Sequence, residues 1–403
     1  MPEIGQRNDD GLCRLGIGNL ANRRGTILDR SAVKGGYLRI GVIAHLKHPI
    51  GEPFAGGLEM HTHLLCRLLR AGGHDVTLFA STRSDPALGV EAICEETAVL
   101  EVGTAEATDV AFFREHHAYL SLMTRLRRSD FDIIHNNSLH YLPVSMADTL
   151  PMPMVTTLHT PPFCWLESGV RECGAGARFV GVSQSIRAGW TRVREIDAVI
   201  PNGIDLQRFQ YRPVAATAPH LIWYGRIVPE KGLHHAIDAA RVAGMPLRIA
   251  GPISDQAYFA ERIAPRLGEE TRYLGHLDHE HLAIEIGAAS AFLCTPCWDE
   301  PYGLVVAEAL ACGTPVAAFA RGAIPEILTP DCGVLAAPDD VADLARAVQA
   351  ASGLSRKACR QRAETACDAQ VMADAYARLY TNLIGQRPGL PIANDRVEDR
   401  LSA

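Results

Sequence analysis

Two cations and two carboxylates stand shortly after apolar runs that are typical of buried β-strands. Arg226 and Lys231 follow one such run, and Glu300 and Glu308 follow a second one. Both polar segments lead into helix-like sequence, so we predict two strand-to-helix turns that open into one crevice at the carboxyl edge of a parallel sheet. Cations and free helix N–H groups suit a diphosphate, and a carboxylate inside the following helix suits vicinal hydroxyls. A nucleotide sugar carries both groups.

The spacing of these residues fits such a ligand. A helix that begins near Gly303 places Glu308 about 7.5 Å along its axis, at roughly 1.5 Å per residue. The N–H groups near Gly303, Leu304 and Val305 can then hold phosphate while Glu308 reaches a ribose. Glu300 stays on the preceding loop, free to face the transferred sugar. The alternative is that Glu308 is a solvated helix carboxylate and Glu300 a first-turn acid that the helix dipole favours, but the apolar neighbours of Glu308 argue against this.

Strand-like and helix-like runs alternate from Leu38 onward, which indicates parallel βαβ units. Residues 1–36 show no sustained period, and we expect a disordered or loosely attached extension there. The proline-containing segment 207–219 has no clear periodicity and is the expected linker. We therefore predict an α/β protein with two Rossmann-like domains, over 37–205 and 206–369.

Other short motifs occur in a characteristic order and separation along the chain. They are Ala55-Gly-Gly-Leu-Glu59, Thr157-Leu-His-Thr160, Val182-Ser-Gln-Ser185, Pro201-Asn-Gly-Ile-Asp205, Gly225-Arg226 through Lys231-Gly232, Gly251-Pro252, Tyr273-Leu-Gly275 and the segment from Glu300 to Glu308. With these motifs the chain resembles the family-4 retaining glycosyltransferases of GT-B fold, from about Leu38 to about Tyr380. It departs from them at Tyr302, where phenylalanine is usual, and at Cys297, where serine is common.

The resemblance implies two Rossmann-like domains that face each other across a cleft. The first domain would bind the acceptor and be completed by a C-terminal helix at about 370–387 that crosses back to it. The second would bind the nucleotide-sugar donor. The implied reaction moves a hexosyl group, with retention of anomeric configuration, to a glycan, a lipid-linked sugar or a small molecule.

The resemblance also assigns residues. The predicted catalytic residues are Arg226, Lys231, Glu300 and His159. The predicted donor-binding residues are Gly57, Gly225, Arg226, Lys231, Tyr302, Gly303, Leu304, Val305 and Glu308. Gly57 would direct its N–H at the donor phosphate, and His159 would face the transferred sugar. Phe163 and Trp165 are candidates for stacking on an acceptor sugar.

We predict neither a metal nor a cofactor, because Arg226, Lys231 and the helix N-terminus can take the diphosphate charge in place of a divalent ion. Cys294 and Cys297 form one C-x-x-C, but no second pair follows at zinc-ribbon spacing. His61 and His63 are two positions apart on an expected helix and do not share a face.

The composition fits a soluble enzyme. A length of 403 residues predicts more than one domain, and the net charge of -7 argues against a nucleic-acid-binding protein. No apolar run approaches the ~20 residues of a membrane span, and the N-terminus lacks the apolar core of a signal peptide. We expect a cytoplasmic protein, with peripheral membrane contact through Arg125, Arg127 and Arg128 as an alternative.

Two other classes remain open. One is a different enzyme on the same fold, such as a sugar-nucleotide epimerase or a phosphorylase-like enzyme. The other is a non-catalytic protein that binds a nucleotide sugar, because the fold alone does not define an activity. The presence of all four charged residues, Arg226, Lys231, Glu300 and Glu308, favours the transferase.

Overall fold

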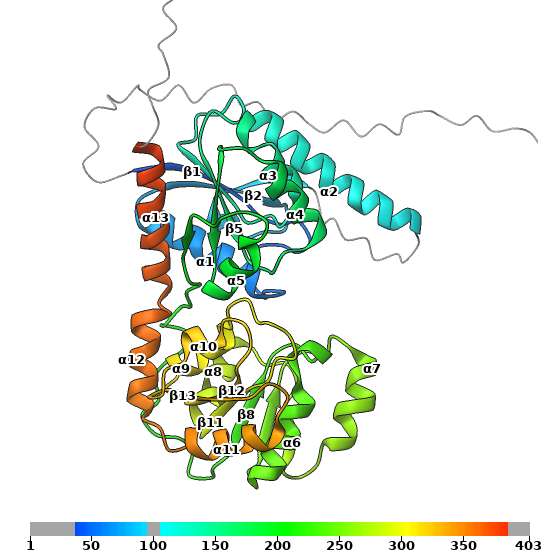
Figure 1. Cartoon of the computed structure of the whole chain (residues 1–403), viewed down its shortest axis with the longest axis vertical. Coiled ribbons are helices and arrows are strands. Elements are labelled where there is room, and N and C mark those ends of the chain that lie inside the picture. Colours follow the sequence, from blue (N-terminus) through cyan, green and yellow to red (C-terminus); the bar gives the residue numbers. More distant parts are fainter. Residues whose placement is uncertain (1–36, 95–104, 386–403) are drawn as a thin grey trace, which may run out of the picture. The chain divides into compact units, whose positions relative to one another are not determined.

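The computed structural model describes residues 37–94 and 105–385 and contains two parallel β-sheets covered by helices (Figure 1). This confirms the predicted α/β class. The expected extension at 1–36 lies outside the described residues, as do residues 386 and 387 of the expected C-terminal helix.

The first sheet has seven parallel strands in the order β3-β2-β1-β4-β5-β6-β7. The strands are β1 (Arg39–Ile43), β2 (Asp75–Ser81), β3 (Val90–Cys94), β4 (Ile133–Asn136), β5 (Met154–Leu158), β6 (Ala177–Gly181) and β7 (Ala198–Val199). The helices that connect them are α1 (Gly57–Ala71), α2 (Ala105–Leu126), α3 (Tyr141–Ser145), α4 (Cys164–Glu172) and α5 (Gln184–Thr191). The order reverses between β1 and β4, and the loops after these two strands are therefore where a ligand is expected.

The second sheet has six parallel strands in the equivalent order, β10-β9-β8-β11-β12-β13. The strands are β8 (Leu221–Tyr224), β9 (Leu247–Ala250), β10 (Thr271–Tyr273), β11 (Ala291–Cys294), β12 (Val316–Phe319) and β13 (Gly333–Ala336). The helices are α6 (Leu233–Ala243), α7 (Gln256–Tyr258), α8 (His279–Ala288), α9 (Leu304–Ala311), α10 (Ile324–Ile327), α11 (Val341–Ala351) and α12 (Arg356–Ala366). Here the order reverses between β8 and β11, the strands that precede the predicted charged turns.

Strand β8 shows why these segments form a sheet that is buried on both faces. Leu221 and Trp223 pack with α6 and α11 on one face, whereas Ile222 and Tyr224 belong to the core on the other face. Alternate residues of a strand point to opposite faces, so a strand covered by helices on both sides is apolar at most positions.

Helix α13 (Ala369–Gly385) packs against α1 and the first sheet, at the red end of the chain in Figure 1. Its residues Met372, Ala373, Tyr376 and Tyr380 are buried in the same core as Ile40. The Tyr376 hydroxyl lies 2.9 Å from the Thr157 hydroxyl on β5, so polar as well as apolar contacts join this helix to the first sheet.

Candidate active site

The turn after β8 presents the two predicted cations. Lys231 ends a short helical turn, and Gly232 follows it with a φ of 63°. A Cβ on Gly232 would lie 2.0 Å from the Thr295 carbonyl oxygen, so the close approach of the turns after β8 and β11 requires glycine here. Arg226 is exposed and makes no hydrogen bond or ion pair with another described residue. Its side chain is therefore available to a ligand.

Lys231 and Glu300 meet across this junction. The Lys231 Nζ lies 2.7 Å from the Glu300 Oε2, and the Trp298 indole N–H donates to the same oxygen at 3.1 Å. The Lys231 ammonium also lies 5.6 Å from the centre of the Trp298 ring. Both charged side chains are largely buried, so this pair forms a fixed polar group at the point where the strand order reverses.

The N-terminus of α9 begins as the sequence predicted. Gly303 precedes the helix in the left-handed region, with a φ of 104°, and no side chain caps the helix. The N–H groups of Leu304 and Val305 have no acceptor within the described ranges, because the first helical bonds start at Val306 and Ala307. The helix therefore offers free donors and the positive end of its dipole to an anion.

Glu308 lies one turn further along α9 and is buried. Burial raises the pKa of Glu308 to about 7, against a smaller opposite effect of the Tyr224 hydroxyl. Tyr224 ends β8, and its hydroxyl donates to the Val305 carbonyl at 2.5 Å. Because Glu308 is shielded from water, its carboxylate can accept hydrogen bonds from a bound ligand in place of water.

His159 follows β5 and is also buried. Its Nε2 donates to the Asn137 Oδ1 at 2.9 Å, and its ring lies edge-on to His61, with centroids 4.7 Å apart. Burial, together with the neighbouring imidazoles of His61 and His135, holds the pKa of His159 well below its ordinary value. His159 is therefore neutral at pH 7 and can act as a dipole rather than as a cation.

The structure brings together Lys231 and Glu300, and it places Glu308 beside the strand that leads to Lys231. Gly57 begins α1 and lies against the start of α9, since a Cβ on it would be 2.7 Å from the Leu304 Cδ1. By contrast, no described hydrogen bond or ion pair links His159 to this group.

Gly225 and Tyr302 complete the predicted donor-binding residues. Gly225 follows β8 with a φ of 150°, and its carbonyl packs on the Gly251 backbone. The Tyr302 side chain is buried beside Cys367, so its predicted role in donor binding concerns the backbone only. Tyr224 and Trp298 were not predicted as partners of the two carboxylates. Tyr224 belongs to the apolar run of β8, and Trp298 lies in the loop after β11, where no periodicity marks it.

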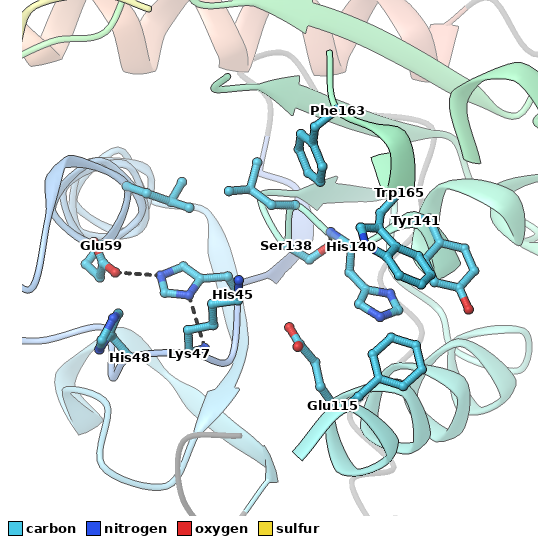
Figure 2. A pocket seen from close by; sticks show the side chains of 13 residues that line it. His45, Lys47, His48, Glu59, Glu115, Ser138, His140, Tyr141, Phe163 and Trp165 are labelled. Carbon is cyan, nitrogen blue, oxygen red and sulfur yellow. Dashed lines mark hydrogen bonds and ion pairs between the residues drawn. The ribbon is translucent and has the colours of Figure 1, made fainter. Parts of the chain in front are cut away.

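A cavity of about 360 Å³ opens at the carboxyl edge of the first sheet (Figure 2). We call it the aromatic pocket, and it is lined by His45, Lys47, His48, Leu58, Glu59, Phe112, Glu115, Ser138, Leu139, His140, Tyr141, Phe163 and Trp165. The residues come from the loops after β1, β4 and β5 and from the helices α1, α2, α3 and α4. The pocket thus lies where the strand order of the first sheet reverses.

The polar side of the aromatic pocket contains a buried pair. The His45 Nε2 lies 2.9 Å from the Glu59 Oε1, and the His45 Nδ1 accepts from the Lys47 backbone N–H at 3.2 Å, as the dashed lines in Figure 2 show. Burial pushes the pKa of Glu59 up, but the His45 imidazole opposes this and leaves it below its ordinary value. Glu59 is therefore a stable carboxylate at pH 7.

A cluster of potential metal ligands was not predicted from the sequence. His234, His235 and Cys297 come together on the second domain, with potential ligand atoms within 4.8 Å of one another. Comparing positions along one helix cannot reveal it, because Cys297 comes from the loop after β11. The His234 Nδ1 is already hydrogen-bonded to the Tyr258 hydroxyl at 2.7 Å, so one member has a partner within the protein.

Comparison with known families agrees with this geometry. Residues 55–208 match the family described as Glycosyltransferase Family 4, and residues 208–366 match the one described as Glycosyl transferases group 1. The glycogen synthase of Mycobacterium tuberculosis is 30% identical, over 86% of this chain and 96% of its own length. The chain therefore belongs to glycosyltransferase family 4 and is a glycosyltransferase.

Other similarities support the same fold. The phosphatidyl-myo-inositol mannosyltransferase of Mycobacterium leprae is 27% identical, over 78% of this chain and 87% of its own length. A solved sucrose-phosphate synthase from Thermosynechococcus elongatus has a TM-score of 0.70 at 21% identity, over 86% of this chain and 99% of that one. HepE from Anabaena, solved with UDP-glucose, has a TM-score of 0.66 at 16% identity, over 86% of this chain and 100% of that one. These neighbours confirm the predicted GT-B fold.

Among the described helices, none combines the length and the apolar character needed to cross a bilayer.

Proposed function

We propose that this glycosyltransferase moves a hexosyl group from a nucleoside-diphosphate sugar to an acceptor, with retention of anomeric configuration and without a metal ion. The observation that carries the proposal is the Lys231–Glu300 pair, with 2.7 Å between Nζ and Oε2, at the switch point that also contains the uncapped N-terminus of α9. One ligand with an anionic diphosphate and hydroxyl-bearing sugars matches these groups. The solved HepE complex with UDP-glucose is a relative in fold that binds such a donor.

The charges suggest how the chain promotes the reaction. The bond between the anomeric carbon and the diphosphate oxygen breaks, a bond from that carbon to the acceptor hydroxyl oxygen forms, and the hydroxyl proton is released. Negative charge grows on the diphosphate, where Arg226, Lys231 and the free N–H groups of α9 would stabilise it. Glu300 would hold the sugar hydroxyls, and Glu308 would accept from the ribose.

The neutral His159 supports the positive charge that grows on the sugar without adding charge of its own. On this proposal it acts through its ring dipole and its fixed orientation, which the Asn137 Oδ1 maintains. We assign no covalent nucleophile. The proposed place of action is the cytoplasm. Nucleotide sugars are available there, and none of the described helices could span a membrane.

A donor screen tests the proposal. Nucleotide release should be measured from a panel of uridine, adenosine and guanosine diphosphate hexoses, with and without acceptors, alongside thermal shift with each free nucleoside diphosphate. We expect stabilisation by at least one nucleotide and acceptor-stimulated release from its sugar. Donor consumption without nucleotide release would instead favour an epimerase, and binding without turnover would favour a non-catalytic protein.

A further inference from the structure

The aromatic pocket has one apolar side, formed by the rings of Phe112, Tyr141 and Trp165. The Phe112 and Trp165 ring centres lie 5.5 Å apart, and those of Trp165 and Tyr141 lie 6.0 Å apart with planes at 29°. Trp165 and Phe112 are 57% and 44% exposed. Large rings left open beside a cavity mark a binding surface, and ring faces of this kind pack against the C–H face of a sugar.

His140 supplies an unpaired donor to the same pocket. Its Nδ1 accepts from the Leu142 backbone N–H at 3.2 Å, so the proton of the neutral ring is on Nε2. His140 is only 8% exposed, and its Nε2 is buried and has no hydrogen-bond partner within the described chain. A buried donor without an acceptor is costly, and an oxygen of a ligand would relieve that cost.

Glu115 supplies an unpaired acceptor. In Figure 2 its carboxylate points into the space between His45 and the aromatic side. It makes no hydrogen bond or ion pair with another described residue. Burial raises the pKa of Glu115, against smaller opposite effects of Lys47 and His45. A hydrogen-bond acceptor and a hydrogen-bond donor that both face the aromatic rings can bind the hydroxyl groups of a sugar.

The charges of the aromatic pocket select against a phosphorylated ligand. Two carboxylates, Glu59 and Glu115, line it, and the imidazole of His140 is neutral because burial, with help from His116 and Lys47, lowers its pKa to about 4. Lys47 also lines the pocket but is exposed, so solvent weakens its charge without removing it. A phosphate in the pocket would meet the unpaired carboxylate of Glu115, whereas Glu59 is already paired with His45.

The aromatic pocket also adjoins the proposed donor site. Leu58 and Glu59, which line it, belong to the first turn of α1, and Gly57 at the start of that turn lies against Leu304 of α9. Its volume of about 360 Å³ falls in the range of roughly 300–1,000 Å³ that is usual for small-ligand sites.

We propose that the aromatic pocket holds the acceptor, and that this acceptor is the uncharged terminal sugar of a saccharide rather than a phosphorylated sugar or lipid. The inference rests on the proposed function, because it names the substrate that accepts the hexosyl group. Trp165 and Tyr141 provide the platform for the sugar ring, and Glu115 and His140 hydrogen-bond its hydroxyls.

The test compares ligands on the intact chain. Saturation-transfer NMR should be recorded with neutral gluco- and manno-oligosaccharides, with glucose 6-phosphate, and with phosphatidylinositol vesicles, in the presence of the nucleoside diphosphate found to bind. We expect signal from at least one neutral oligosaccharide and none from the phosphorylated sugar or the vesicles. Preference for a phosphorylated ligand, or no signal from any neutral saccharide, overturns the proposal.

Variants locate the site. Trp165→Ala and Glu115→Gln should each raise the KM for the best neutral acceptor about tenfold or more, the effect of losing roughly 1.4 kcal/mol of binding free energy. Phe113→Ala is the matched control: Phe113 is 63% exposed, neighbours Phe112 on α2 and does not line the pocket, so its KM should stay unchanged. Equal effects of Trp165→Ala and Phe113→Ala contradict the assignment.

The two proposals fail in different ways. Titration of the free nucleoside diphosphate reports on the donor site alone. Nucleotide binding without any neutral saccharide signal rejects the acceptor inference and leaves the donor site standing. A neutral saccharide signal in the aromatic pocket without binding of any nucleotide rejects the proposed function, and with it the role of the saccharide as an acceptor.

Discussion

Lys231 and Glu300 are 69 residues apart in the sequence, yet the Nζ of one lies 2.7 Å from the Oε2 of the other. The pair couples the turn after β8 to the loop after β11, and the Trp298 indole fixes the shared carboxylate oxygen. On the proposed function, the cation that would serve the leaving group and the carboxylate that would serve the sugar are thus held at a defined separation before any donor binds. Such preorganisation avoids reorganising charges during the reaction.

Removing either cation should abolish most turnover. Arg226→Ala and Lys231→Ala are each expected to lower kcat by about 100-fold or more, because both charges stabilise a leaving group whose charge grows in the transition state. Circular dichroism and thermal melting confirm that the variants fold. Arg346→Ala is the control, since Arg346 is exposed on α11 and pairs only with Asp343 among the described residues. Near-native activity of a folded Lys231→Ala variant would contradict the donor-site assignment.

The two glutamates should separate in their effects. Glu308→Gln is expected chiefly to weaken nucleotide binding, because the ribose is present in both the donor and the product. Glu300→Gln is expected chiefly to lower kcat and change sugar choice, because its partner is the group that moves. Isothermal titration with the free nucleoside diphosphate measures the difference. If Glu300→Gln loses nucleotide affinity and Glu308→Gln keeps it, the two roles are reversed.

Glu308 should make stability depend on pH. Its pKa of about 7 in the folded state exceeds the ordinary value of 4.5, so the folded chain holds a proton that the unfolded chain has lost between these values. Stability contributed by this group is therefore complete below about pH 4.5 and falls as the pH rises to about 7, by about 3 kcal/mol at most.

Glu308→Gln removes this dependence. The variant should be more stable than the wild type at pH 8 without nucleotide, and the advantage should shrink toward pH 5. Urea unfolding at both pH values measures it, with Glu364→Gln on the exposed face of α12 as a control. An advantage that grows as the pH falls would mean that Glu308 is ionised and stabilised in the folded chain.

Activity should survive chelation. The proposed site places cations and the N-terminus of α9 where other transferases use a divalent ion, so dialysis against EDTA should leave nucleotide release nearly unchanged. Cys297→Ser is the companion variant, because Cys297 clusters with His234 and His235 as potential metal ligands. Loss of activity on chelation, restored by magnesium or manganese, would show that a metal takes part.

Much of this fold could be predicted from the sequence because its central strands are largely apolar. The edge strands β3, β7 and β13 are weaker signals in the sequence. β3 has no buried residue, β7 is only 2 residues long, and the two middle residues of β13 are not buried. The helix start at Gly303 was predicted correctly because a glycine followed by an apolar run is a local signal.

The sites divide in the same way. The Lys231–Glu300 contact follows from sheet topology, which brings strand ends together even when they are distant in the sequence. The aromatic pocket does not follow from sheet topology. Phe112, Tyr141 and Trp165 lie on separate helices, and their convergence depends on side-chain packing. The unpaired Nε2 of His140 is likewise visible only once its neighbours are known.

The stereochemistry of transfer tests the central claim most directly. The purified chain should be supplied with the nucleotide hexose identified by the donor screen and with a neutral oligosaccharide, and the product should be followed by proton NMR. We predict release of the nucleoside diphosphate together with a glycoside whose anomeric configuration matches that of the donor. A product of inverted configuration, or donor consumption without release of the nucleotide, would contradict retaining hexosyl transfer at this site.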